Sequence, residues 1–407
     1  GSTMVMLELP TYVVKNAINI CEEVNAKYTE EYGEDEYGED EEWGLTPFDV
    51  LQSAYDKTDL MHYPEDVVEE EIKKFEEQFS RFIGRKYSVA VSSGTGALEI
   101  AIKALNIKKN DEVLIPNFTI ISNALAVIKQ QLKPVLIDCN LKDWNIKIED
   151  IEKNISKKTK AIIITHIYSF PNDMNKILKI CKKYNLLVIE DAAEVLGIKY
   201  KNKMCGSFGD ISTFSFYANK QVTTGEGGML SMNSFKIYEK CKSLRNLCFG
   251  KLNRFNHDDI GWNFRMTNMQ AALGLSQLKN IKYVIKKKMK IGSYYYKKLY
   301  KNSNIRILPP SNAFSKNIYW VVGIVIKKGK ITASMLSKKL ARYGIGTRPF
   351  FWPMREQSIF KKMKMFKNKK FPNSSYLAKY GLYLPSYFKL KKKDIDYISS
   401  VINKFLL

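Results

Sequence analysis

Lys220 is the residue whose setting most suggests covalent chemistry. It follows an apolar, aromatic run at 211–217 and precedes a polar, glycine-rich turn at 223–228. β-Branched and aromatic residues between glycines are typical of a buried strand, so the lysine would stand at a strand end where little side-chain bulk crowds the backbone. Burial there would lower the pKa of its amine, and a neutral amine is what a Schiff-base lysine needs.

Other polar groups follow other predicted strand ends. The segment VSSGTGAL at 91–98 passes from a strand through Gly-x-Gly into a helix, and the unpaired N–H groups at such a helix start form an anion site. Apolar strands at 161–166 and 186–190 end in a histidine and lead into an aspartate. Because ligands of open α/β sheets bind at the carboxyl ends of the strands, we expect one site that contains Ser93, Gly94, His166, Asp191 and Lys220.

The elements that must position these residues alternate between strand and helix. Apolar strands joined by helices indicate an α/β protein with a mostly parallel, doubly wound central sheet. We expect one long helix at 265–290 and a boundary near 302–311, followed by a smaller α+β domain. The predicted parts are an N-terminal arm with an acidic run (1–60), a large α/β domain (61–300) and a small C-terminal domain (301–407).

Composition restricts the function classes. The formal net charge is +23, but it comes mostly from lysines scattered along the chain, without a basic stripe interleaved with aromatics, so we expect no nucleic-acid partner. No apolar run reaches the roughly 20 residues of a membrane span. The six cysteines show neither a C-x-x-C pair nor zinc-ligand spacing, so we expect a cytoplasmic protein with reduced thiols and no bound metal.

Seven blocks together resemble the nucleotide-sugar aminotransferases of fold type I that depend on pyridoxal 5′-phosphate (PLP), the DegT-like family, and within it the perosamine and viosamine synthases. The lysine block is specific to that family, whereas SGTGAL by itself is not. The blocks occur in the family's order and are VSSGTGAL (91–98), DEVLIPNFT (111–119), HIYSFPNDM (166–174), VIEDAAE (188–194), GSFGDISTFSFYANKQVTTGEGG (206–228), GWNFRMTNMQAALGLSQL (261–278) and GTRPFFWPM (346–354).

The resemblance implies a role for each matched residue. Lys220 would be the Schiff-base and proton-shuttling lysine, and Asp191 would keep the pyridine nitrogen protonated so that the ring is an electron sink. Asn263 of the GxN motif would reach the cofactor phosphate of the neighbouring subunit, which implies a homodimer with shared active sites. The phosphate would be held within the chain by Gly94, Thr95, the Gly96 amide and Ser215, and the substrate would lie near His166, Arg348, Phe351 and Trp352.

Two positions and one region depart from the family pattern. Glu194 stands where the family usually has Gln or His beside the phenolic oxygen of the cofactor, so a carboxyl there would have to be protonated or displaced. Ile120 stands where an aromatic residue commonly stacks on the pyridine ring, so an aliphatic side chain would cover the ring instead. The first 60 residues do not match the family's usual opening.

The implied activity is a ping-pong transfer. L-Glutamate would convert PLP to pyridoxamine phosphate, and the amine would then pass to C4 of a nucleotide-linked 4-keto-6-deoxyhexose. The product would be a 4-amino-4,6-dideoxy nucleotide sugar, of viosamine or perosamine type, for glycan synthesis. Amination of a 3-keto sugar at C3 and a non-catalytic basic binding protein on the same scaffold stay open as alternatives. The family's dehydratases carry histidine instead of the lysine, so Lys220 argues against dehydration. The sequence does not distinguish UDP, GDP and dTDP as the nucleotide carrier.

Overall fold

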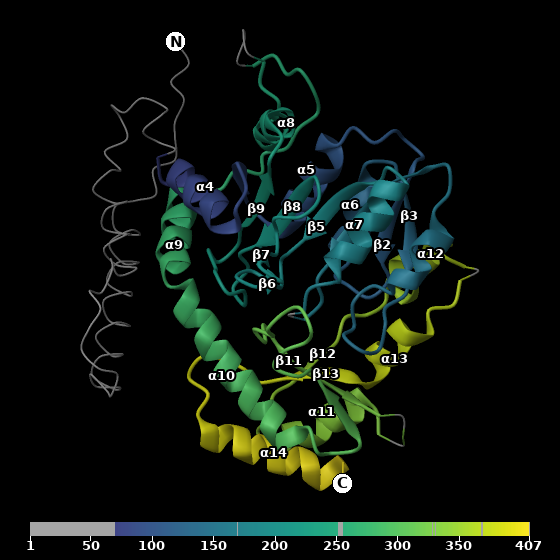
Figure 1. The fold of residues 1–407 in the computed structure, drawn as a ribbon, viewed down its shortest axis with the longest axis vertical. Helices are drawn as coiled ribbons and strands as arrows, with labels where there is room; N and C mark the ends of the chain where they lie inside the picture. The colour runs from purple at the N-terminus through teal and green to yellow at the C-terminus, as the bar shows by residue number, and fades with distance from the viewer. Residues whose placement is uncertain are drawn as a thin grey trace.

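The computed structural model describes residues 70–406 except 169, 251–254, 328, 330 and 368. Within this range the chain forms a larger α/β unit and a smaller α+β unit, which helix α10 (Ile281–Leu299) connects along one side (Figure 1). The predicted arm at 1–60, with its acidic run, lies outside the described residues.

A seven-stranded sheet forms the centre of the larger unit, in the order β1-β9-β8-β5-β4-β2-β3. The pairings among β8, β5, β4, β2 and β3 are parallel, and only β9 runs antiparallel to both of its neighbours. The prediction of a mostly parallel central sheet is therefore confirmed. The strands are β1 (Tyr87–Val91), β2 (Glu112–Pro116), β3 (Lys133–Ile137), β4 (Thr159–Thr165), β5 (Leu187–Asp191), β8 (Ile211–Ser215) and β9 (Gly228–Met232).

Helices cover both faces of this sheet, because alternate residues of the strands face opposite layers. Ile162 and Ile164 of β4 pack in the core beneath α4, α7 and α9, while Ala161 and Ile163 pack in the core beneath α5, α6 and α8. The helices are α4 (Glu70–Ile83), α5 (Gly94–Ala104), α6 (Ser122–Lys129), α7 (Met174–Lys183), α8 (Phe235–Arg245) and α9 (Asn268–Lys279).

The single long helix predicted at 265–290 is wrong, because the chain forms two helices there. Helix α9 ends at Lys279 and α10 begins at Ile281. Between them, Asn280 donates its backbone N–H to the carbonyls of Gln277 and Leu278, and its side-chain amide lies 3.5 Å from the Ser276 carbonyl. Asparagine competes for backbone partners in this way, which favours helix ends over helix interiors.

The smaller unit is built on a four-stranded antiparallel sheet in the order β10-β11-β13-β12. Residues 354–371 leave this unit, and Met354, Phe360 and Phe371 pack in the core of the larger one. The proposed domain boundaries stay a prediction. The elements after α10 are β10 (Ile305–Ile307), β11 (Val322–Ile326), α11 (Ala333–Ala341), β12 (Arg348–Pro349), α12 (Ser358–Lys362), α13 (Pro372–Tyr380), β13 (Gly381–Leu384) and α14 (Lys392–Leu406).

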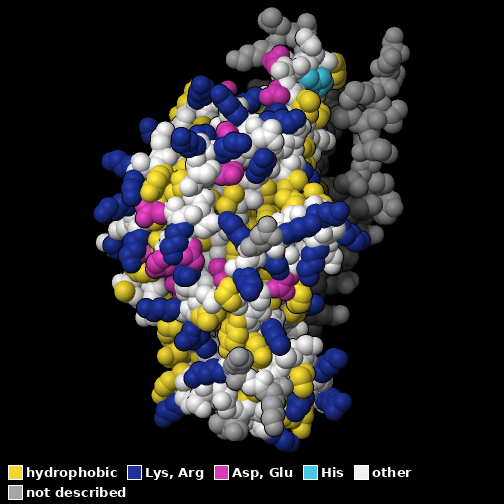
Figure 2. Space-filling model, turned by 90° about the vertical axis from the view of Figure 1, so that its right-hand side faces the viewer, with side chains coloured by type: hydrophobic (Ala, Val, Ile, Leu, Met, Phe, Trp, Pro, Cys, Tyr) yellow, Lys and Arg dark blue, Asp and Glu magenta, His cyan; other side chains and the backbone are white. Residues whose placement is uncertain are grey.

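The distribution of surface charge and the character of the helices relate to the expectations of no nucleic-acid partner and no membrane span. Lys and Arg side chains are spread over the face in Figure 2, interspersed with acidic and apolar ones. None of the helices in the described ranges is both long enough and apolar enough to cross a membrane.

Candidate active site

Lys220 lies in the loop that joins β8 to the antiparallel strand β9, just beyond the carboxyl end of β8. Its backbone N–H donates to the Tyr217 carbonyl at 2.9 Å, and the Trp320 indole N–H donates to the Asn219 carbonyl at 2.8 Å. The Lys220 amine lies 3.8 Å from the centroid of the Trp320 ring. The smaller unit, which carries Trp320, thus fixes the lysine loop of the larger unit.

Two buried carboxyl groups share the electrostatic environment of this amine. Burial lowers the pKa of Lys220, and the charges of Glu194 and Asp191 oppose that shift. Burial raises the pKa of Asp191, opposed by its hydrogen bond from the Ala193 N–H and by the Lys220 charge. Burial also raises the pKa of Glu194 to about 7, against the Lys220 charge and the Tyr168 N–H. Each group is therefore pushed toward its neutral form.

Hydrogen bonds fix the Asp191 carboxyl at the end of β5. Its Oδ2 accepts from the Thr165 hydroxyl at 3.3 Å, and its Oδ1 accepts from the Ala193 N–H at 3.2 Å. Thr165, at the end of the neighbouring strand β4, accepts in turn from the Asn123 amide of α6 at 2.6 Å. The sequence pattern does not single out Thr165 or Asn123. Thr165 could have been found from the sequence, because it is a polar residue at the end of an apolar strand.

The prediction that His166 faces the active-site cleft is not met, because its side chain lies in the core. Its side chain is fully buried, and Nδ1 accepts the backbone N–H of Asn172 at 3.1 Å. The proton is therefore on Nε2, which donates to Glu190 at 2.9 Å. Both ring nitrogens of His166 therefore form hydrogen bonds within the protein, and neither is left to contact a substrate directly.

The same buried network accounts for a group of residues that resembles a metal site. Ligand atoms of His166, Glu190 and Cys205 lie within 4.8 Å of one another. However, Glu190 also accepts the backbone N–H groups of Gly206 at 2.6 Å and Phe208 at 2.7 Å. Burial raises the pKa of the Cys205 thiol, which disfavours the thiolate that binds metals. These contacts make the group a structural hydrogen-bond network.

The helix start that we predict as an anion cradle is present as the first turn of α5, but one of its amides is not available. Ser93 caps the helix and its hydroxyl accepts the Gly96 N–H at 3.0 Å, so the Gly96 amide is already paired. The amides of Gly94 and Thr95 belong to the first turn, whose N–H groups have no partner within a helix. The Thr95 hydroxyl lies 2.8 Å from that of Ser122, a residue that the sequence pattern did not single out.

Gly94 is required by the closeness of strand β8. A Cβ atom at this position would lie 2.8 Å from Ser215 Cβ and 3.2 Å from Ser215 Oγ. The helix start and Ser215 can therefore face the same small space only because residue 94 has no side chain. Ser215 is half-buried at the end of β8, four residues before the lysine loop reaches Asn219.

Asn263 and Ile120 are both exposed beside this region. The segment that carries Asn263 lies against the cradle of its own chain, because the Ser92 N–H donates to the Phe264 carbonyl at 2.8 Å. The Phe264 ring would be 3.1 Å from a Cβ at Gly96. The roles of Asn263 toward a neighbouring subunit and of Ile120 over the cofactor ring stay predictions.

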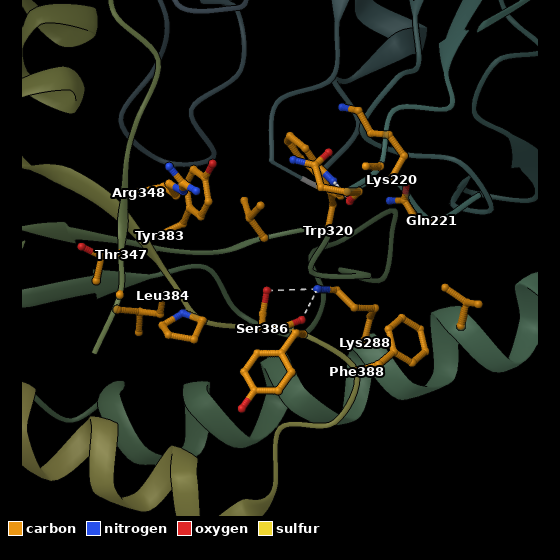
Figure 3. A pocket seen from close by; sticks show the side chains of 17 residues that line it. Lys220, Gln221, Lys288, Trp320, Thr347, Arg348, Tyr383, Leu384, Ser386 and Phe388 are labelled. Atoms are coloured by element: carbon orange, nitrogen blue, oxygen red, sulfur yellow. Dashed lines mark hydrogen bonds between the residues drawn. The ribbon is translucent and has the colours of Figure 1, made fainter. Parts of the chain in front are cut away.

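A cavity of about 700 Å³ lies between the lysine loop, α10 and the strands of the smaller unit (Figure 3). Lys220 and Trp320 stand on one side of it, and Arg348 and Tyr383 on the other. Among the described residues, its lining contains three basic side chains, Lys220, Lys288 and Arg348, and no Asp or Glu. A cavity with this lining suits an anionic ligand.

The predicted substrate residues of the GTRPFFWPM block separate in space. Arg348 lines the cavity from β12. The Phe351 ring stacks on Tyr168 at 5.1 Å, and Tyr168 donates its backbone N–H to Glu194 at 2.7 Å. Trp352 instead lines a second cavity, of about 560 Å³, and its indole N–H donates to a backbone carbonyl at 3.1 Å. Within one chain, Trp352 is therefore outside the cavity that holds Lys220.

Comparison with known proteins agrees with this arrangement. Residues 66–403 match the DegT/DnrJ/EryC1/StrS aminotransferase family. The GDP-perosamine synthase of Escherichia coli O157:H7 is 38% identical over 337 residues, which cover 82% of this chain and 90% of that protein. The GDP-perosamine synthase of Vibrio cholerae is 33% identical over 335 residues, which cover 82% and 90%.

A solved structure shares the fold. PseC of Helicobacter pylori, an aminotransferase involved in the biosynthesis of pseudoaminic acid, superposes with a TM-score of 0.81 at 24% identity, covering 89% of this chain and 97% of that one. The predicted family and its enzyme class are confirmed by the family match and the sequence relatives. This chain belongs to the DegT/DnrJ/EryC1/StrS aminotransferase family of PLP-dependent enzymes.

Proposed function

We propose that this protein transfers the amino group of L-glutamate to C4 of a GDP-linked 4-keto-6-deoxyhexose. The observation that carries the proposal is Lys220, whose amine has a lowered pKa and stands beside two buried carboxyl groups at the edge of a parallel sheet. A lysine held in this way can act as a nucleophile and as a proton carrier.

The residues at the sheet edge fit PLP as the cofactor. The helix start at Gly94 and Thr95, with Ser215 opposite, leaves a small space lined by amide and hydroxyl donors, which suits a phosphate group. Asp191 supplies a fixed carboxyl for the ring nitrogen, and Lys220 supplies the amine. When bound, PLP supplies a carbonyl carbon and an electron-withdrawing ring.

The protein's own side chains would divide the remaining work. Asp191, which the Thr165 hydroxyl and the Ala193 N–H orient, would hold a proton at the ring nitrogen. The Lys220 amine, whose pKa burial lowers, would take a proton from one carbon and return it to another. Trp320, packed over this amine, would limit the access of water to it.

The choice of C4 and of GDP is supported by the relatives. Three GDP-perosamine synthases match over 80% or more of this chain, the first at 38% identity. A UDP-N-acetyl-3-dehydro-α-D-glucosamine 3-aminotransferase from Acidithiobacillus ferrooxidans matches at 30%. Amination at C3 is therefore the less favoured alternative. Glutamate as the donor and a homodimer with shared sites are part of the proposal.

The test is to incubate PLP-loaded protein with glutamate and either a GDP- or a UDP-linked 4-keto-6-deoxyhexose, and to locate the new nitrogen by mass spectrometry and NMR. We expect nitrogen at C4 of the GDP sugar and no product from Lys220→Ala. Nitrogen at C3 would overturn the position, and preference for the UDP sugar would overturn the carrier. Absence of any amino sugar from properly loaded protein would overturn the proposal.

A further inference from the structure

A second lysine, Lys288, lines the cavity that contains Lys220, on the side formed by α10. Lys288 lies on α10 and is 9% exposed. Its amine donates to the Ser386 carbonyl at 2.6 Å and to the Ser386 hydroxyl at 3.0 Å (Figure 3). An ammonium group has three N–H donors, so one is left over from these two hydrogen bonds.

Within the part of the chain that the structure describes, Lys288 has no acidic partner. Burial lowers the pKa of its amine to about 8, and no carboxylate among the described residues opposes that shift. Buried lysines are ordinarily paired with an acid or satisfied in another way, because desolvation of an unpaired charge is costly. The Ser386 oxygens are dipoles and do not neutralise the charge.

The rest of the cavity points to what completes the site. Of the three basic side chains among the described lining residues, Lys220 has its own role in the proposed reaction, which leaves Lys288 and Arg348 for an anion. None of the described lining residues is an Asp or a Glu that would compete with an incoming anion. Both proposed substrates carry anionic oxygens, as carboxylates in glutamate and as phosphates in the nucleotide sugar.

We propose that Lys288 binds an anionic oxygen group of a substrate, a carboxylate or a phosphate, at the floor of the cavity that holds Lys220. The proposal rests on the proposed aminotransferase function and adds a binding residue to it. Neither the lysine-rich sequence around position 288 nor the matched blocks single this residue out, because the block on this side of the chain ends at 278.

A purely structural role is the alternative, and α10 offers a matched control for it. Lys288 and Tyr295 both hold the segment that follows β13, since the Tyr295 hydroxyl donates to the Pro385 carbonyl at 3.0 Å. Tyr295→Phe removes one anchoring hydrogen bond without removing a charge. Lys288→Met removes both the charge and the hydrogen bonds while keeping an unbranched apolar stem.

The ping-pong scheme allows each substrate to be tested alone. Single-turnover rates are measured on the PLP form with glutamate and on the pyridoxamine phosphate form with the GDP-linked keto sugar, each over a range of concentrations. We expect Lys288→Met to raise the half-saturating concentration of one substrate by about tenfold or more, the scale of a hydrogen bond to a charged group. The saturating rate and the other substrate should change less than twofold, and Tyr295→Phe should behave as wild type.

The outcomes separate the two roles. Unchanged half-saturation for both substrates in Lys288→Met would overturn the proposal, as would an equal effect of Tyr295→Phe. If Lys288→Met does not fold, Lys288→Gln keeps a donor for Ser386 and carries the same test. If wild-type protein performs neither half-reaction, the proposed function fails separately. Calorimetric binding of glutarate and of GDP to wild type and variant then tests the anion site, and equal affinities would overturn it.

Discussion

Gly94→Ala is the substitution that most directly tests the cradle at the start of α5. The new Cβ would lie 2.8 Å from Ser215 Cβ, 3.2 Å from Ser215 Oγ and 3.4 Å from the Phe214 carbonyl. The first and last of these belong to strand β8 and cannot rotate away, so the helix start has to move from the strand. Such overpacking costs about 1–3 kcal/mol of folding free energy.

The same displacement would open the cradle that we propose for the cofactor phosphate. Each 1.4 kcal/mol of lost interaction weakens binding tenfold, so we expect the dissociation constant for PLP to rise by about one to two orders of magnitude. The assay is a fluorescence or absorbance titration of cofactor-free protein with PLP. Denaturant unfolding of the same preparation, without cofactor, measures the folding cost separately.

A second glycine gives the control. Gly346→Ala introduces a Cβ that meets nothing within 4 Å, so folding stability and PLP affinity should stay close to those of wild type. If Gly94→Ala binds PLP as tightly as wild type and unfolds at the same denaturant concentration, the cradle is not where we place it.

Three further predictions concern the residues around Lys220. Borohydride reduction of PLP-loaded protein, followed by peptide mapping, should place the label on Lys220, and a label on another lysine would exclude the assignment; Lys220→Ala should still bind pyridoxamine phosphate, because the cradle is unchanged. The pKa of Glu194 is raised from its ordinary value to about 7 by burial, so the folded protein binds more protons than the unfolded chain between about pH 4.5 and 7, and this carboxyl costs stability as the pH rises through that window. Glu194→Gln should therefore gain stability relative to wild type between pH 5 and 8 in denaturant unfolding of cofactor-free protein; a constant difference across that range would contradict the shift. Mixing Lys220→Ala with Asn263→Ala should restore part of the activity through mixed dimers, and no recovery after demonstrated subunit exchange would count against shared sites.

The strand ends of a parallel sheet made much of the site predictable. Lys220, Asp191 and the start of α5 follow apolar strands, and the carboxyl ends of such strands meet at one edge of the sheet. This argument needs only local patterns and the parallel arrangement, both of which are visible in the sequence. It could not say which face of the sheet each neighbouring residue occupies.

His166 shows why that limit matters. Asp191 lies near Lys220, whereas the adjacent Glu190 points to the opposite layer and accepts the His166 proton. Because side chains alternate along a strand, one residue of register decides between the cleft and the core. The Gly96 amide is a second example. The sequence presents it as a phosphate donor, but in the structure its N–H already donates to the Ser93 hydroxyl.

By itself, the sequence determined the family, the parallel sheet and the lysine at its edge. These depend on hydrophobic periodicity and on short sequence blocks that occur in the order typical of the family. Only the tertiary structure decided that Trp352 lies in another cavity and that Lys288 enters the cavity beside Lys220. The hydrogen bond from Lys288 to Ser386 joins residues 98 positions apart. No local pattern encodes such a contact, since it arises from how α10 packs against the segment after β13.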